Sequence, residues 1–263
     1  MNRSRLVGLL KELKLRGLIS LKAEYESEGS TDEDIFFLKE LCISSDLGLH
    51  VKIGGVEARR DFRRCLIIGV DGIIAPMVEN PFCGSKFIGM FNNDEEFYGK
   101  EIWDIHRSIN IETKYAVSEI ESIIEKVGDQ IDNITIGRSD LSGSYFDENI
   151  KQDSHEVTSD IERVLVAIQN SNKKIQMTVG GGVTSKTVQP LLENDFLISN
   201  IHAIETRKCM IDSKKILEDS SIIDDVLEFE MAYLDNRVNT RHSLDIYLDQ
   251  ARLKELISRL SEK

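Results

Sequence analysis

The chain has 263 residues, of which 41% are hydrophobic and 30% are charged, and this composition is typical of a globular protein with one substantial core. The 33 basic and 46 acidic residues give a net charge of −13, which argues against a duplex nucleic-acid binder and against binding to anionic membranes. No segment approaches the roughly 18 consecutive apolar residues of a membrane span. The first residues also lack the apolar run of a signal peptide. We therefore expect a cytoplasmic protein without nucleic-acid or membrane partners.

Short apolar segments that predict strands alternate with periodic segments that predict helices between Leu18 and Thr206. The expected strands are Leu18–Glu24, His50–Ile53, Gly72–Met77, Ser108–Glu112, Asn133–Gly137, Gln176–Gly180 and Asn200–Glu205. The expected helices are Asp32–Ile43, Glu57–Ile68, Ala116–Val127, Ser159–Asn170 and Ser185–Asn194. This alternation is typical of a parallel sheet with crossover helices. The length suits a TIM-type (β/α)8 barrel, so the eighth strand is either a short element or the barrel closes irregularly.

Asn92–Glu96, a run of polar residues between these segments, is expected to form an exposed loop. Two long amphipathic segments, about residues 214–236 and 243–260, follow the last strand. We expect residues 1–263 to form a single barrel domain with additional C-terminal helices over about 214–263. The last segment places five apolar residues near one face, namely Leu244, Leu248, Leu253, Ile257 and Leu260.

That apolar face packs either on its own domain or on a neighbouring subunit. A barrel already covered by its own helices has little apolar surface left for another helix. Burying a leucine-sized side chain contributes roughly 1.5–3 kcal/mol, so a symmetric partner is a natural place for this face. We therefore expect a homo-oligomer.

Glu112 and Asp140 follow two consecutive predicted strands. In a parallel barrel the carboxyl ends of the strands form the face that carries the chemistry. Two carboxylates with few ligands of other kinds suit a hard divalent cation, Mg²⁺ or Mn²⁺, whose shell a 2-oxo acid or hydroxy acid would complete. The alternative is that both are solvated loop acids.

The segments Ile111–Thr113 and Ile136–Ser142 resemble the metal-site signature of the HpcH/HpaI aldolase and citrate lyase beta-subunit superfamily. Further segments, in the same order, resemble its citrate-lyase-like branch: residues 22–29, 52–58, 75–79, 180–183 and 205–208. The resemblance implies a metal on Glu112 and Asp140. It also implies a carbon–carbon lyase or aldolase that acts through a metal-stabilised enolate, and a trimer or hexamer. The implied substrate is a small 2-oxo or β-hydroxy carboxylate or its acyl-coenzyme A ester.

Three basic residues are candidates for binding the substrate carboxylate. The superfamily commonly uses an arginine near the second or third strand end, and Lys52 stands at the position that matches it here. Lysine is a point donor without the bidentate fork of arginine. Arg207, at the end of the seventh strand, and Arg138, two residues before Asp140, are the alternative sources of that fork. Each of the three could instead form a structural ion pair.

Lys22, Glu24 and Glu26 alternate along the first predicted strand and therefore project to one side of it. Burying three charged side chains on one side of a barrel strand costs free energy unless they point into a site that contains water. The superfamily usually has a histidine base near this point, and this chain has none there. We expect Glu24 to be the acid/base if burial or a like charge raises its pKa. The alternative is a structural pair between Lys22 and a glutamate.

Gly180, Gly181 and Gly182 end a strand and precede a helix, and Gly54 offers a similar device after the second strand. These glycines form either an anion cradle or a tight turn. Glu79 either reaches the metal or the water molecules bound to it, or belongs to a structural turn. The residues assigned catalytic roles are Glu24, Lys52, Arg138 and Arg207. Those assigned to substrate binding are Lys22, Lys52, Gly54, Gly180, Gly181, Gly182 and Arg207.

Two other functions remain open at this stage. One is a phosphoenolpyruvate- or phosphonate-type barrel enzyme, which also uses acidic ligands and magnesium. The other is a catalytically inactive lyase-like subunit, since Lys52 replaces the expected arginine and the histidine is missing. Whether coenzyme A forms part of the substrate is also open, because the sequence shows no clear adenine or pantetheine site.

Overall fold

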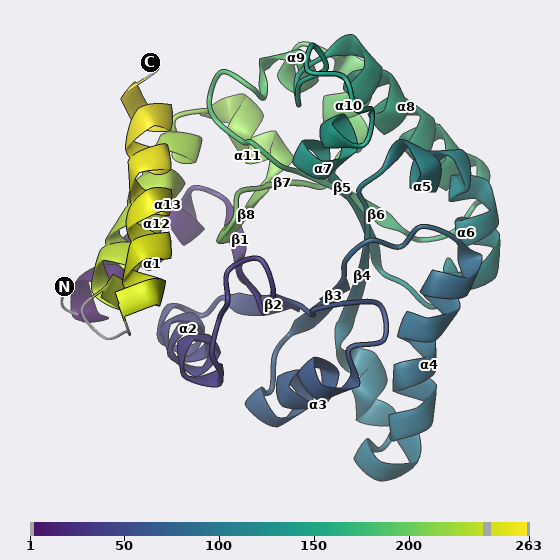
Figure 1. Ribbon diagram of the computed structural model, residues 1–263, viewed down its shortest axis with the longest axis horizontal. Helices are drawn as coiled ribbons and strands as arrows, with labels where there is room; N and C mark the ends of the chain where they lie inside the picture. Colours follow the sequence, from purple (N-terminus) through teal and green to yellow (C-terminus); the bar gives the residue numbers. More distant parts are fainter. Residues whose placement is uncertain (1–2, 239–242, 262–263) are drawn as a thin grey trace.

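The computed structural model describes residues 3–238 and 243–261 of the chain. Eight strands form a closed barrel in sequence order, surrounded by helices (Figure 1). The strands are β1 (Leu18–Glu24), β2 (Gly48–Lys52), β3 (Gly72–Ala75), β4 (His106–Ile111), β5 (Asn133–Gly137), β6 (Gln176–Gly180), β7 (Ala203–Glu205) and β8 (Cys209–Asp212). The closed barrel confirms the predicted TIM-type fold, and each of the seven predicted strands overlaps an observed one.

The helices connect the strands or follow them. They are α1 (Arg3–Leu15), α2 (Asp32–Ser45), α3 (Arg59–Ile68), α4 (Pro81–Tyr98), α5 (Lys114–Ser118), α6 (Ile120–Val127), α7 (Arg138–Gly143), α8 (His155–Asn170), α9 (Gln189–Leu192), α10 (Asp195–Asn200), α11 (Ser213–Glu218), α12 (Ile222–Val238) and α13 (Ser243–Ser261). A short 3-10 helix, η1 (Lys100–Asp104), follows α4. None of the helices in the described part of the chain is both long and apolar enough to cross a membrane.

The eighth strand is a short element that closes the barrel irregularly. β1 to β7 pair in parallel along the chain, whereas β8 is antiparallel to both β7 and β1. Only Thr206, Arg207 and Lys208 connect β7 to β8, and a parallel connection needs a much longer crossover. The Thr206 N–H donates to the Cys209 carbonyl at 2.8 Å, which closes a hairpin. The tip of this hairpin therefore lies at the carboxyl end of β7.

The expected exposed loop at Asn92–Glu96 is wrong, because these residues lie inside α4. α4 continues to Tyr98 and ends at Gly99, whose φ of 79° favours glycine. Asp94 is buried and its carboxylate lies 3.1 Å from Arg63 and 3.6 Å from Arg59. Two arginines of α3 thus satisfy the buried acid, so the polar run is compatible with a packed helix.

The two faces of the barrel strands differ in polarity. Ile109 and Ile134 are fully buried on the outer face, where the helices pack. The inner face instead carries a hydrogen-bonded polar layer: Asn133 Nδ2 donates to Ser108 at 2.8 Å, and Thr178 donates to Asn133 Oδ1 at 3.0 Å. TIM-type barrels usually fill this space with branched apolar residues. A cluster of charged side chains lies next to this polar layer, at the carboxyl ends of the strands.

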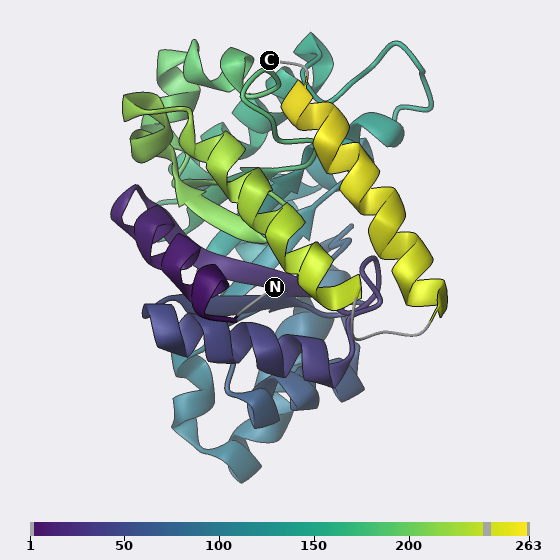
Figure 2. The same ribbon diagram turned by 90° about the vertical axis from the view of Figure 1, so that its left-hand side faces the viewer.

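The C-terminal helices run side by side, with α13 packed along α12 (Figure 2). Leu256 is fully buried, whereas Leu248 and Ile257 are 56% and 53% exposed. The predicted apolar stripe is therefore only partly right: Leu253 and Leu260 pack against the core, but Leu248 and Ile257 point away from it. The side chain of Leu244 lies outside the described residues. The predicted homo-oligomer stays a prediction.

Candidate active site

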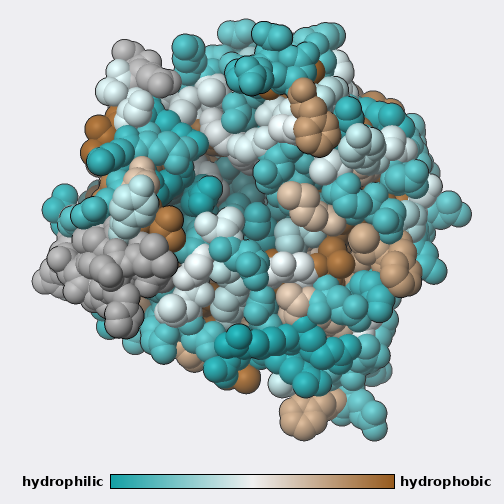
Figure 3. All heavy atoms as spheres, in the orientation of Figure 1, coloured by the Kyte–Doolittle hydropathy of each residue, from teal (hydrophilic) through white to brown (hydrophobic). Residues whose placement is uncertain are grey.

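A cavity of about 230 Å³ lies at the carboxyl ends of the barrel strands. Figure 3, in the orientation of Figure 1, shows a hollow near the centre of this face with hydrophilic residues around it. The predicted site residues that line the cavity are Lys22, Glu24, Lys52, Glu112, Asp140, Gly181, Gly182 and Arg207. The barrel thus gathers residues from six parts of the sequence at the face where such enzymes place their chemistry.

Glu112 is buried at the end of β4, and its carboxylate is held from two directions. The Met77 N–H donates to Oε2 at 3.0 Å, and the Asn110 amide donates to Oε1 at 3.0 Å. Met77 has a φ of 50°, a left-handed conformation that is unusual for a residue with a side chain. This backbone turn after β3 directs the Met77 N–H at Glu112, so the carboxylate is fixed in place.

Asp140 is in the first turn of α7, and its side-chain carboxylate forms no hydrogen bond or ion pair with the other described residues. Burial, followed by the charge of Glu112, raises the pKa of Asp140. Two carboxylates that repel each other across a cavity are the arrangement that a bound cation would stabilise. The pair therefore has the electrostatic character expected of a cation site.

The donor atoms around Glu112 and Asp140 fit a hard divalent cation. Asn110 Oδ1 is buried without a hydrogen-bond partner among the described residues, so a third oxygen is available beside the two carboxylates. Within the described ranges no group of three or more acidic, histidine or cysteine side chains could hold a metal. An oxygen-only set of this size suits Mg²⁺ or Mn²⁺, which keeps waters and substrate oxygens in its shell.

Glycines next to the site leave room for acidic side chains. A Cβ on Gly137 would lie 2.7 Å from Glu112 Cγ, and a Cβ on Gly180 would lie 2.7 Å from Glu205 Cγ. Gly180 does not line the cavity, so its contribution is space for Glu205. Gly181, with a φ of 87°, lies so close to α7 that a Cβ would meet the Ser139 nitrogen at 2.5 Å. The segment is a tight turn whose Gly181 and Gly182 form part of the cavity wall.

The floor of the cavity is a row of alternating charges. Lys22 Nζ lies 2.5 Å from Glu205 and 3.5 Å from Glu24. Lys52 Nζ lies 3.4 Å from Glu24 and 3.8 Å from Glu112. We call these five side chains the floor. Because each lysine stands between two carboxylates, the floor neutralises most of its own charge.

This pairing corrects the role expected for Glu24. Burial acts to raise its pKa, but Lys22, then Lys52 and the hydroxyl of Ser27, lower the pKa to about 2. Glu24 therefore stays ionised at neutral pH and is not a raised-pKa acid. The alternative, a structural pair with Lys22, is what the structure contains. Glu26 does not join the row, since it lies against the neighbouring Gly54.

Two other predicted site residues, Arg138 and Gly54, do not line the cavity. Arg138 is 1% exposed, and its guanidinium donates to the carbonyls of Gly180 and Thr187 at 3.2 and 2.8 Å. Burial lowers its pKa to about 10. The Gly54 N–H donates to Asp61 at 2.8 Å, so it is not free to bind an anion. In both cases protein groups bind the donors: Asp61 accepts from the Gly54 N–H, and two backbone carbonyls accept from two of the Arg138 nitrogens.

Glu79 also has a structural partner outside the cavity. It accepts a hydrogen bond from the Thr113 hydroxyl at 2.6 Å and does not line the cavity. Of the two interpretations of this residue, the structure therefore contains the structural turn.

Sequence analysis assigned no site role to several residues that line the cavity, among them Asn110, Glu205, Arg252 and Arg259. Asn110 lies two residues before Glu112 on the same strand, so alternation along β4 could have found it. Glu205 is the last residue of β7, so the rule that found Glu112 at the end of β4 could also have found Glu205. The two arginines are on α13, and their spacing places them on one helix face. Nothing in their local sequence shows that this face meets the barrel mouth.

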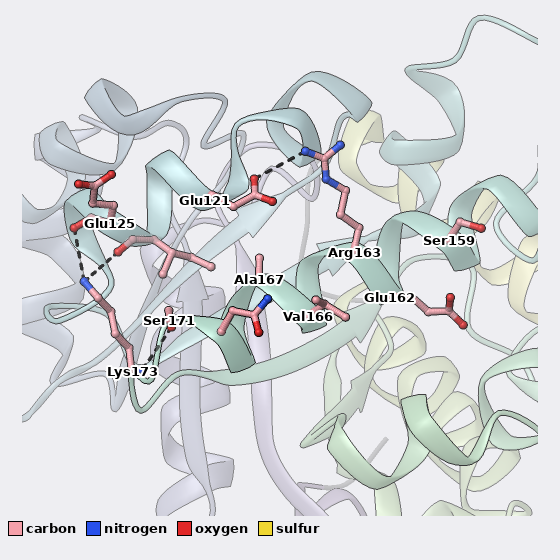
Figure 4. A pocket seen from close by; sticks show the side chains of 11 residues that line it. Glu121, Glu125, Ser159, Glu162, Arg163, Val166, Ala167, Ser171 and Lys173 are labelled. Carbon is pink, nitrogen blue, oxygen red and sulfur yellow. Dashed lines mark hydrogen bonds and ion pairs between the residues drawn. The ribbon is translucent and has the colours of Figure 1, made fainter.

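A larger cavity of about 620 Å³ lies outside the barrel, between α6 and α8. Figure 4 shows its side chains, with Glu121 paired to Arg163 and Lys173 directed at the end of α6. It is a groove on the outside of the barrel, and its two basic side chains are paired, Arg163 with Glu121 and Lys173 with Asp129. The smaller cavity at the strand ends is the better candidate, since it holds the buried carboxylates.

No family model matches the sequence, and no curated protein does. Solved structures do resemble it. An HpcH/HpaI aldolase/citrate lyase family protein from Burkholderia cenocepacia J2315 is 15% identical, with a TM-score of 0.61 over 78% of this chain and 83% of the other. The HpcH/HpaI aldolase from Desulfitobacterium hafniense DCB-2 is 18% identical, with a TM-score of 0.57 over 73% and 79%. The citrate synthase SbnG is 17% identical, with a TM-score of 0.60 over 82% and 86%.

The chain has the fold of the HpcH/HpaI aldolase and citrate lyase proteins. At these identities the likeness shows the fold and no more. It confirms the resemblance found in the sequence at that level, and the chemistry must be argued from the residues of the cavity.

Proposed function

We propose that this protein is a divalent-metal-dependent carbon–carbon lyase or aldolase that acts on a small 2-oxo or β-hydroxy carboxylate. The observation that carries the proposal is the shared cavity of Glu112 and Asp140, with the unpartnered oxygen of Asn110 beside them. The fold shared with aldolase and citrate lyase family proteins supports it. The proposed metal is Mg²⁺ or Mn²⁺, and the substrate is the free acid or its coenzyme A ester.

Glu112, Asp140 and Asn110 would hold the cation. When bound, a divalent cation polarises the substrate carbonyl and stabilises the negative charge that develops on its oxygen. The hydrogen bond from the Met77 N–H keeps Glu112 aimed at this position before any ligand arrives. Such preorganisation removes the need to reorient the carboxylate during the reaction.

Lys52 and Arg207 would bind the substrate carboxylate. Lys52 stands between Glu24 and Glu112, so its ammonium group is at the edge of the proposed metal position. Arg207 is exposed at the tip of the β7–β8 hairpin and forms no ion pair within the described part of the chain. Its guanidinium fork therefore remains available for a carboxylate.

Glu24 acts in this proposal as a positioning residue. It is ionised and lies within 3.5 Å of Lys22 and 3.4 Å of Lys52. It holds both ammonium groups at the cavity floor and moves no proton itself.

The test combines metal binding with a substrate screen. Purified protein with Mg²⁺ or Mn²⁺ is incubated with β-hydroxy acids, 4-hydroxy-2-oxo acids and coenzyme A esters, and released oxo acid is measured. We expect release only with metal. Asp140→Asn should lower kcat/KM by about 10²–10³-fold, the range for losing one preorganised charge contact, and should weaken Mn²⁺ binding.

Glu121→Gln, which neutralises an exposed acid on α6, is the matched control and should change neither measurement. If Mn²⁺ binds equally well to wild type and Asp140→Asn, the proposed metal site is wrong. If the metal binds at the site but no substrate class is cleaved, the inactive lyase-like subunit becomes the better interpretation.

A further inference from the structure

The proposed reaction needs a residue that moves a proton, and most charged side chains of the cavity already have another role. Glu112 and Asp140 would hold the cation. Lys52 and Arg207 would bind the substrate carboxylate. Glu24 has a pKa of about 2 and stays ionised at neutral pH. No histidine among the described residues lines the cavity, so the acid/base must be another of its side chains.

Lys22, at the centre of the floor, stays protonated. Burial acts to lower the pKa of its ammonium group, but the charges of Glu205 and Glu24 outweigh burial and raise the pKa. Because an ammonium group has no free electron pair, Lys22 cannot accept a proton from a substrate. Of the acidic side chains that line the cavity in the described part of the chain, Glu205 is the one left without a role.

The two carboxylate oxygens of Glu205 have different surroundings. Glu205 is the last residue of β7 and is only 3% exposed. Lys22 Nζ lies 2.5 Å from Oε1, whereas Oε2 is buried without a hydrogen-bond partner among the described residues. Both oxygens of Glu24 and of Glu112, by contrast, have partners. A buried oxygen without a donor costs free energy, and a substrate hydroxyl would supply that donor.

Two glycines separate Glu205 from the proposed metal position. Gly137 on β5 pairs with Gly180 on β6, and Gly180 pairs with Glu205 on β7. Glu112 lies beside Gly137, and Glu205 lies beside Gly180. A Cβ at either glycine would be 2.7 Å from the Cγ of its glutamate. The two carboxylates thus flank a stretch of barrel wall without side chains, over which a small substrate can extend from the metal position to Glu205.

We infer that Glu205 is the catalytic acid/base of the proposed reaction. The inference rests on the proposed function, because it takes the 2-oxo end of the substrate to lie at Glu112 and Asp140. It places the proton-transferring group at the end of the seventh strand, away from the first strand, where sequence analysis expected it.

Cleavage of a 4-hydroxy-2-oxo acid shows what Glu205 would do. Its carboxylate accepts the proton of the substrate hydroxyl, the O–H electron pair forms a carbonyl, and the neighbouring carbon–carbon bond breaks. The electron pair of that bond passes into the 2-oxo fragment, which becomes an enolate. The protonated Glu205 then returns its proton to the enolate carbon, so that the 2-oxo acid is released and the carboxylate is restored.

Exchange of 2-oxo acid protons with solvent tests the inference before the full substrate is identified. The protein is incubated with Mn²⁺ and pyruvate or 2-oxobutyrate in D₂O, and deuterium at C3 is measured by mass spectrometry. Removal of a C3 proton is the reverse of the last step. Glu205→Gln should therefore slow exchange by about 10²–10⁴-fold, the usual contribution of a general acid–base residue. Calorimetric titration should show that this variant still binds Mn²⁺ and the 2-oxo acid.

Chemical rescue separates proton transfer from support of the floor. In Glu205→Ala the shortened side chain leaves space for formate, which should raise the exchange rate. Chloride has the same charge as formate but is not a base, so it should not raise the rate. Glu121→Gln, which changes an exposed acid on α6, should exchange at the wild-type rate.

A second variant covers the risk that Glu205→Gln fails to fold. Glu205→Asp keeps a negative charge for Lys22 but draws the carboxylate back by one methylene group. It should bind the 2-oxo acid and still exchange its protons more slowly than wild type.

Three results would overturn the inference and leave the proposed function standing. They are exchange at the wild-type rate by a folded Glu205→Gln or Glu205→Asp, rescue of Glu205→Ala by chloride as well as by formate, and a wild type that binds a 2-oxo acid without exchanging its protons. Failure of wild type to bind either 2-oxo acid in the presence of Mn²⁺ would overturn both.

Discussion

The floor of the cavity and its rim, which we define as Arg207, Arg252 and Arg259, both carry several charges, but they are built in different ways. The floor consists of side chains at strand ends, and Lys22, Glu24 and Glu205 are each no more than 5% exposed and paired with one another. The rim arginines come from a hairpin and a helix, and Glu255, the acid that Arg252 and Arg259 share, is half exposed and does not line the cavity. Buried charges that are paired support the fold, whereas charges with spare donors are free to meet a ligand.

The largest effect should follow from breaking the floor at its centre. Lys22→Met leaves Glu24 and Glu205 buried without their shared partner, which should lower the free energy of unfolding by about 3–5 kcal/mol. Urea denaturation measures it. Lys86→Met, which breaks an exposed pair with Glu57, is the control and should cost less than about 1 kcal/mol. Adding Glu205→Leu to Lys22→Met should restore part of the loss, and no restoration would contradict the pairing.

Acid should weaken the floor in a defined pH range. The pKa of Glu24 is lowered from 4.5 to about 2, so its ionised form contributes stability that is fully present above pH 4.5. That contribution is lost as the pH falls through about 2. The difference in unfolding free energy between wild type and Glu24→Gln should therefore shrink from pH 5 to pH 2 in urea titrations. A difference that stays constant over this range would show that Glu24 is not held ionised by the lysines.

Gly137→Ala tests the metal position beside the floor. The new methyl group would lie 2.7 Å from Glu112 Cγ, so the carboxylate must leave the position set by Met77 and Asn110. We expect Mn²⁺ affinity to fall by about 10–100-fold, as when a supporting contact of a metal ligand is lost. Gly143→Ala, which meets no atom within 4 Å, is the matched control in the same calorimetric titration. Equal affinities in the two variants would argue against Glu112 as a ligand.

The smallest effect on stability should come from the rim. Arg259 pairs with Glu255 one turn away on α13, and such pairs contribute only about 0.3–0.5 kcal/mol. Arg259→Gln should therefore leave the urea midpoint almost unchanged. A loss of more than about 2 kcal/mol would show that Arg259 supports the fold in the manner of the floor.

Much of the fold could be predicted because its signals are local. The apolar runs of β1, β5 and β6 gave those strands with their observed bounds. The eighth strand could not be predicted because Cys209–Asp212 is short and follows β7 after only three residues. No helix separates the two strands, so the strand–helix alternation gave no sign of it. The loop expected at Asn92–Glu96 failed because two arginines of another helix satisfy Asp94, a contact that no local pattern shows.

The candidate site could be predicted where residues follow strands. Glu112, Asp140 and Lys52 were placed at strand ends by the sequence, and the cavity gathers all three. Arg138 was misjudged because side-chain direction at the start of α7 depends on the Gly180 and Thr187 carbonyls that bind it. Glu24 was misjudged because its pKa depends on two lysines whose distances only the folded barrel sets.

The sequence by itself determined the barrel class and the strand-end acids, because both follow from hydrophobic periodicity and from the geometry common to parallel barrels. Only the tertiary structure decided which charges neutralise one another and which remain for a ligand. Electrostatic pairing depends on distances of a few ångströms between residues far apart in the chain, as between Lys22 and Glu205. The packing of α13 on α12 likewise brings Arg252 and Arg259 to the barrel mouth, a placement that helical periodicity cannot specify.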